Sequence, residues 1–197
     1  MNNFKPLQLL TDTLGSSAFA HLKEHFPSMA TPYRVRKGRI LVNIGQVNDN
    51  IYFLHSGVMR SYYIINDEDI TSRLIGEGDI ACIAESFFTR KKSDEAIEVL
   101  EDSLLYSVSY EEYRALAKED VLISNLIVQM LELRLISFSE KVKLFKFLTV
   151  EQRIEAYINH PSSLFRRISD HYIATYLGTT PATFSRCLKS VLRDKKL

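Results

Sequence analysis

The chain has 197 residues, a formal net charge of +1 and 46% hydrophobic residues. This composition is that of an ordinary globular protein, long enough to bury a core without disulfides. Its two cysteines, Cys82 and Cys187, are too few for a disulfide framework or for a four-cysteine zinc or iron–sulfur site. No unbroken run of 18 apolar residues occurs, and the N-terminus lacks the features of a secretory signal. We therefore expect a cytoplasmic protein without a membrane span.

Positive charge is concentrated towards the end of the sequence. Residues 161–197 contain seven basic and two acidic residues, so they carry about +5 and leave about −4 on residues 1–160. A basic module joined to an acidic body is typical of proteins that bind a polyanion. Charge alone is equally compatible with a solvated basic helix end.

The first predicted elements are one or two short helices within residues 7–25, followed by a strand-rich region from Tyr33 to about Tyr110. The helices are indicated by apolar residues at mostly helical spacing, namely Leu9, Leu10, Leu14, Phe19 and Leu22. The strands are indicated by short runs rich in β-branched and aromatic residues, at 40–42, 51–54, 62–65, 96–100 and 104–108. Hairpin turns are predicted between such runs at Lys37-Gly38, Ser56-Gly57 and Asn66-Asp67. This spacing predicts a small antiparallel sandwich or barrel.

After Ser109 the pattern becomes helical, and the longest predicted helix covers residues 121–145. One apolar stripe on it follows a heptad repeat, through Leu131, Leu135, Phe138, Val142 and Phe145. A second stripe on a neighbouring face contains Leu126, Met130 and Leu133. One stripe can pack on the protein's own sandwich while the other meets a partner helix, which predicts a dimer. A single wide core-facing helix is the alternative.

A further helix is predicted over Glu151–Asn159, and residues 170–189 then have the layout of a helix-turn-helix. Apolar residues are spaced to bury two short helices against each other, at Ile173, Leu177, Phe184 and Cys187. Ala174 is small where the helices would cross, and Gly178 stands where the turn needs a positive φ. Thr180 followed by Pro181 is a helix start, with a hydroxyl cap and proline at the first helical position.

The second helix of this pair presents a polar face that is suited to DNA. In a helix-turn-helix the second helix enters the major groove and reads base edges. Arg186 suits a bidentate contact with guanine, and Lys189 suits a phosphate. The candidate DNA contacts are Thr180, Ala182, Thr183, Ser185, Arg186 and Lys189. An ordinary helical hairpin is the alternative interpretation.

Over almost its whole length the sequence resembles the Crp/Fnr superfamily of bacterial transcription regulators. The resemblance rests on Val35-Arg36-Lys37-Gly38 with Gly45, on 51–57, on Gly76-Glu77-Gly78-Asp79 and most strongly on 172–186. It implies an α+β fold with three parts: an antiparallel β-roll of the double-stranded β-helix or jelly-roll type, a long dimerisation helix and a winged helix-turn-helix. The implied domains are residues 1–120, 121–146 and 147–197.

The function that the resemblance implies is that of a homodimeric, sequence-specific transcription regulator. Its expected partners are palindromic double-stranded DNA, a second copy of the chain, RNA polymerase and a small-molecule effector. No enzyme activity, cofactor or metal is expected, because no nucleophile elbow, P-loop or dinucleotide fingerprint occurs. His55 and His171 are interpreted as structural or surface residues. The alternative function is a ligand-binding or protein-interaction module with a basic docking tail.

Two segments depart from the family members that bind cyclic AMP. Those members carry Gly-Glu-Leu and then an Arg-Ser pair that holds the cyclic phosphate, whereas this chain has Cys82–Ser86 and Lys92–Ala96. Asp94 and Glu95 place carboxylates where a phosphate requires a cation. We therefore expect an effector other than cyclic AMP. A modified pocket would be lined by Glu85, Ser86, Lys92 and Ser93, and a plain surface loop is the alternative.

Overall fold

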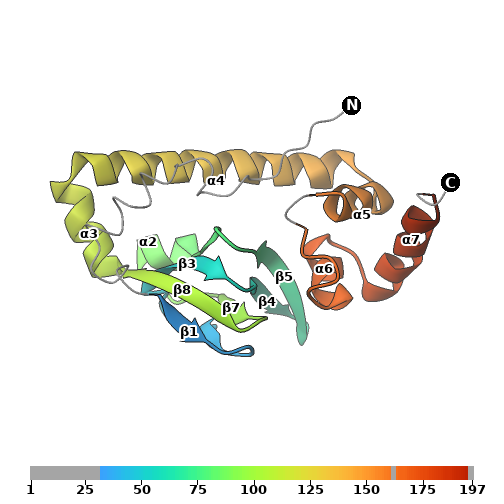
Figure 1. Ribbon diagram of the computed structural model, residues 1–197, viewed down its shortest axis with the longest axis horizontal. Coiled ribbons are helices and arrows are strands. Elements are labelled where there is room, and N and C mark those ends of the chain that lie inside the picture. Colours follow the sequence, from blue (N-terminus) through green and yellow to red (C-terminus); the bar gives the residue numbers. More distant parts are fainter. Residues whose placement is uncertain (1–31, 161–162, 195–197) are drawn as a thin grey trace.

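The computed structural model describes residues 32–160 and 163–194, in which strands come first and helices follow. The helices predicted within residues 7–25 lie outside this part of the chain. The long helix α4 runs over one side of the strands, with α3 at one end and the C-terminal helices at the other (Figure 1).

The strands form two four-stranded sheets with entirely antiparallel pairing. One sheet has the order β1-β8-β3-β6, from Tyr33–Val35, Ser103–Ser109, Asn50–Ser56 and Ile80–Ala81. The other has the order β2-β7-β4-β5, from Ile40–Val42, Glu95–Val99, Met59–Ile65 and Glu68–Ile75. We call these two sheets the roll.

The two sheets enclose an apolar core because alternate residues of each strand point inward. Its members include Leu54, Met59, Ile75, Ile97 and Leu105, none of which is more than 2% exposed. The hairpin between β4 and β5 turns at Asn66 and Asp67, with φ of 52° and 63°. Two central residues with positive φ match the right-handed twist of the flanking strands, so the turn predicted at this pair is confirmed.

Three helices follow the roll strands or interrupt them. Helix α2 (Ala84–Thr89) lies between β6 and β7, in a segment where the sequence predicted no helix. Helix α3 (Tyr110–Glu119) leads to α4 (Val121–Phe147). Asp120 begins α4, because its carboxylate accepts hydrogen bonds from the backbone of Leu122 and Ile123 at 2.8 and 3.2 Å.

Three more helices complete the described chain. Helix α5 (Val150–Ile158) begins with a capping box between Thr149 and Gln152. Helices α6 (Asp170–Tyr176) and α7 (Pro181–Asp194) form the predicted pair. No strand follows β8 in residues 110–160 and 163–194, so the strands of a wing are not observed there. Residues 165–167 instead form a turn, with Arg166 at a φ of 71°.

Helix α4 is long and apolar enough to cross a membrane, judged by length and composition only. The sequence prediction considered only unbroken apolar runs and therefore did not anticipate this. A single such helix is weak evidence, and two of its residues, Met130 and Leu133, pack against the roll beside Ile80 and Phe87.

Candidate DNA-binding site

Helices α6 and α7 are held together by a small buried cluster. Ile173, Ala174, Leu177 and Phe184 are 2% exposed or less, and Cys187 packs against them. These are the residues whose spacing predicted the helix pair. Their burial fixes the angle of α7 and directs the remaining side chains of that helix outward.

The turn between the two helices depends on Gly178. Its φ is +68°, and a Cβ placed there would lie 2.8 Å from the Phe145 ring and 3.1 Å from Nη1 of Arg153. Arg153 also donates from Nη1 to the carbonyl oxygen of Leu177 at 2.6 Å. The turn therefore contacts α5 through Arg153 and the end of α4 through Phe145, in addition to the two helices that it joins.

Helix α7 begins as the sequence predicts. The Thr180 hydroxyl accepts a hydrogen bond from the backbone of Thr183 at 3.2 Å, and Pro181 is the first helical residue. The Thr180 hydroxyl donates to the Thr183 hydroxyl at 3.1 Å. Both threonines thus form the helix start, which positions the side chains that follow.

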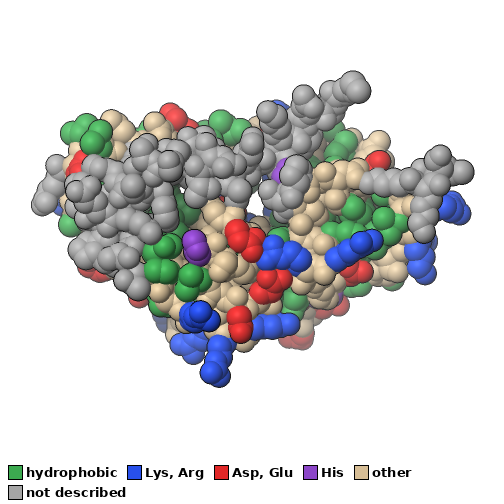
Figure 2. All heavy atoms as spheres, in the orientation of Figure 1, with side chains coloured by type: hydrophobic (Ala, Val, Ile, Leu, Met, Phe, Trp, Pro, Cys, Tyr) green, Lys and Arg blue, Asp and Glu red, His purple; other side chains and the backbone are tan. Residues whose placement is uncertain are grey.

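The other four candidate DNA contacts share one exposed face of α7. Ala182, Ser185, Arg186 and Lys189 are all exposed. Basic side chains stand out over the region of α7, near the C-terminus (Figure 2). A helix that presents arginine and lysine on its free side can contact phosphates and base edges.

The four candidate effector residues differ in exposure and in hydrogen bonding. Glu85 and Lys92 are exposed, whereas Ser86 and Ser93 are buried and make hydrogen bonds that hold the backbone. The Ser86 hydroxyl accepts from the backbone of Asn48 at 2.9 Å and donates to the Lys91 carbonyl at 2.6 Å. The Ser93 hydroxyl donates to the carbonyl of Glu95 at 2.8 Å and accepts from its backbone N–H at 3.0 Å.

A group of cations between α4 and β5 was missed by the sequence analysis. Burial and the neighbouring Arg73 lower the pKa of Lys141 to about 8 and that of Arg134 to about 10. Lys141 donates to the carbonyl of Ser72 at 2.6 Å, and Nη1 of Arg73 is buried without a hydrogen-bond partner in the described chain. Arg73 pairs through Nη2 with Asp79 at 3.4 Å, and Glu95 is a further nearby acid.

The spacing along α4 contains a signal for this group. Arg134 and Lys141 follow Met130 by four and eleven residues, so both lie on the helix face that Met130 turns to the roll. Cations on a core-facing stripe are unusual, because burial without a partner is costly. We call Arg73, Arg134 and Lys141 the cation group.

The comparisons with known proteins concern the roll and the overall fold. Residues 32–120 match the family model of the cyclic nucleotide-binding domain. Among curated proteins, no relative matches the chain by sequence.

Solved structures match the chain beyond the roll. FixK2 from Bradyrhizobium japonicum is 20% identical with a TM-score of 0.70, covering 84% of this chain and 85% of its own. The catabolite activator protein of Thermus thermophilus is 20% identical with a TM-score of 0.54, covering 94% and 87%. A putative regulator of the Crp/Fnr family from Eubacterium rectale is 19% identical with a TM-score of 0.64, covering 94% and 87%. Residues 32–120 are thus similar to a cyclic nucleotide-binding domain, and the chain has the fold of Crp/Fnr-type regulators.

Proposed function

We propose that the chain is a sequence-specific, DNA-binding transcription regulator that reads the major groove with α7. The observation that carries this proposal is the exposed face of Ala182, Ser185, Arg186 and Lys189, on the second helix of a tightly packed pair. The first helix of such a pair crosses the DNA backbone while the second enters the groove. Thr180 and Thr183 hold the start of the reading helix in place.

The active form in this proposal is a homodimer joined through α4. The heptad stripe is the feature that supports it, since Leu135 and Phe138 are 69% and 67% exposed in the single chain. Exposed apolar residues that continue over several turns mark an interaction site. A second copy of α4 would cover this stripe, while Met130 and Leu133 stay on the roll.

The division of labour in this proposal assigns residues 1–120 to sensing, 121–146 to dimerisation and 147–197 to DNA binding. The protein would act in the cytoplasm, with RNA polymerase as a further partner and without enzymatic activity of its own. The proposal includes a wing beside α7. No strand of such a wing is among residues 110–160 and 163–194.

The effector in this proposal is an anion other than cyclic AMP, held between the roll and α4. The cation group supports an anion, because a bound negative charge would favour the charged forms of Lys141 and Arg134, which burial disfavours. Glu95 argues against cyclic AMP, since it lies in the segment that would otherwise carry the phosphate-binding arginine. Titration calorimetry should give no binding of cyclic AMP below about 100 μM, because an unfavourable carboxylate and a lost bidentate contact act together.

A mobility-shift assay on genomic fragments, repeated over a salt series, tests the central proposal. Specific binding should weaken steeply with salt, as phosphate contacts release counterions. Arg186→Ala should cost about ten- to a hundredfold in specific affinity and relax the preference at one base pair. Lys189→Ala should weaken all sequences alike and reduce the salt slope by about one. If parent and variants retard no duplex at any salt, the C-terminal helices are a protein-docking tail instead.

A further inference from the structure

The DNA-binding helices of a single chain are held against the roll by an arginine clamp. Arg167, in the segment before α6, donates to both carboxylate oxygens of Glu77 at 2.9 and 2.7 Å and to Glu101 at 2.8 Å. Glu77 lies in the turn after β5 and Glu101 in the turn after β7. The carboxylates of Glu77 and Glu101 therefore bind the guanidinium of Arg167, which lies just before the helices proposed to bind DNA.

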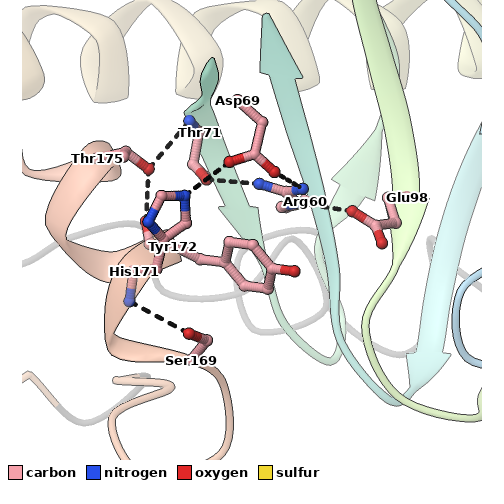
Figure 3. A network of polar contacts seen from close by, with 8 residues as sticks. All are labelled: Arg60, Asp69, Thr71, Glu98, Ser169, His171, Tyr172 and Thr175. Atoms are coloured by element: carbon pink, nitrogen blue, oxygen red, sulfur yellow. Dashed lines mark hydrogen bonds and ion pairs between the residues drawn. The ribbon is translucent and has the colours of Figure 1, made fainter. Parts of the chain in front are cut away.

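A second contact joins α6 itself to the roll (Figure 3). Nε2 of His171 lies 2.7 Å from Oδ1 of Asp69, and the backbone N–H of Thr71 donates to the Thr175 hydroxyl at 3.2 Å. Asp69 also pairs with Arg60, whose guanidinium lies between the rings of Tyr62 and Tyr172 (4.2 and 3.8 Å). Acidic and basic side chains alternate over this boundary on the surface (Figure 2).

The charges of this contact are those of a protein–DNA interface, with carboxylates in place of phosphates. The segment 163–194 contributes the charge of Arg167 and a ring nitrogen of His171, and the roll contributes the carboxylates of Glu77, Glu101 and Asp69. Carboxylates and phosphates both bind arginine through two parallel hydrogen bonds. The hydrogen bonds from Arg167 lower the pKa of Glu77, so this carboxylate stays ionised over a wide range of pH.

We propose that the roll restrains its own DNA-binding helices, with Glu77, Glu101 and Asp69 standing in for DNA phosphates against Arg167 and His171. This inference rests on the proposed function. DNA must then displace the carboxylates before Arg167 can bind a phosphate, because the same N–H groups of the guanidinium cannot donate to a carboxylate and a phosphate at once. Any signal that loosens the roll from α6 raises the fraction of chains that are free to bind DNA.

The double variant Glu77→Gln/Glu101→Gln tests the restraint. Both carboxylates are partly exposed, so removing their charges should leave the fold intact. Affinity for a random duplex at low salt should rise about two- to fivefold for each ion pair lost. The salt slope should steepen by about one, because Arg167 gains a phosphate contact. Hydrogen exchange in α6 without DNA should become faster.

A matched control separates this effect from a general change in charge. Glu68→Gln/Glu111→Gln removes the same charge at two exposed carboxylates outside the clamp. The proposal requires a larger gain in the clamp variant than in the control. The single variant Glu101→Gln, which keeps the pair with Glu77, should show a smaller gain in the same direction.

Three results would overturn the inference. An equal affinity in clamp and control variants would mean that the clamp does not restrain DNA binding. A lower affinity in the clamp variant would mean that the contact does not restrain α7 but holds it in the orientation that binds DNA. If the parent itself binds no duplex, the proposed function fails together with this inference, and the parent measurement alone reveals that case.

Discussion

Gly178 is the residue on which the geometry of the turn before α7 depends most directly. Gly178→Ala should destabilise the C-terminal helices, because alanine resists a φ of +68° and its Cβ would meet Phe145. The positive φ alone costs about 1–2 kcal/mol. Urea unfolding followed by circular dichroism measures the loss.

Gly45→Ala is the matched control for this substitution. Gly45 also has a positive φ, of +84°, but a Cβ there would meet nothing within 4 Å. Its variant should show the backbone cost alone and keep full DNA affinity. Equal effects of the two variants on stability and binding would contradict the contact with Phe145.

Lys141 should give the free energy of unfolding a particular dependence on pH. Its pKa falls to about 8 in the folded chain, from an ordinary 10.5, chiefly through burial. Between these values the unfolded chain binds more protons, so the contribution of Lys141 to stability rises with pH. In Lys141→Met this rise should be missing, and urea midpoints compared at about pH 8 and about pH 10 would reveal it.

The difference between parent and variant is the informative quantity here, because tyrosines titrate in the same range. Lys146→Met, at an exposed position of the same helix, serves as the control and should follow the parent. A parallel pH dependence in parent and Lys141→Met would mean that this ammonium is as solvated in the folded chain as in the unfolded one.

At the scale of single residues, the sequence predicted backbone roles better than side-chain partners. Asn66-Asp67, Gly178 and Thr180 could be predicted because each meets a local requirement of φ or of a helix start. Ser86 and Ser93 were grouped in a pocket, yet both hydroxyls serve the backbone. Ser86 does so through Asn48, 38 residues away, a partner that no local pattern reveals.

Among the elements, α4 carries the clearest expectation. Leu135→Glu should turn dimers into monomers at micromolar concentration, because a charge buried in the stripe without a partner is costly. The dimer dissociation constant should rise about tenfold or more, as measured by light scattering. Gln129→Glu, exposed on the side away from the stripe, should leave the dimer unchanged. A parent that is monomeric at this concentration would exclude the dimer altogether.

Strands were predicted where apolar or alternating runs occur and missed where charges interrupt them. The runs at 40–42, 51–54, 62–65, 96–100 and 104–108 overlap β2, β3, β4, β7 and β8. Strand β5 was not predicted, because its sequence EDITSRLI mixes acids and an arginine with apolar residues. Two of those charges, Asp69 and Arg73, have partners outside their own strand. These charged residues find their partners only in the folded chain, so the strand cannot be recognised from an apolar pattern in the sequence.

For the whole molecule, the proposed dimer predicts the spacing of the proposed DNA site. Two reading helices joined through α4 should contact half-sites about 34 Å apart, or about ten base pairs centre to centre, in an imperfect palindrome. Inserting about five base pairs between the half-sites should reduce affinity to that of one half-site, because the second would face away. Mobility shifts on the two duplexes test this. Equal affinities would indicate independent reading units.

The order of the parts could be predicted from the sequence, but their contact could not. The change from strand runs to helical stripes near Ser109 indicated where the roll ends, and the basic excess of residues 161–197 marked the part proposed to bind DNA. Arg167 was counted there among the basic residues. Its carboxylate partners lie 66 and 90 residues away, so only the folded chain brings them to it.

The position of α6 on β5 also bears on the protein's tendency to self-associate. Strand β5 is the edge of its sheet, and an open edge invites pairing with a strand of another molecule. The Thr175 hydroxyl accepts the N–H of Thr71, so the helix occupies part of that edge. Release of α6 and α7 would uncover it. Any state of the protein in which α6 leaves β5 for long therefore carries a risk of self-association, which favours a brief release or prompt binding to the proposed DNA site.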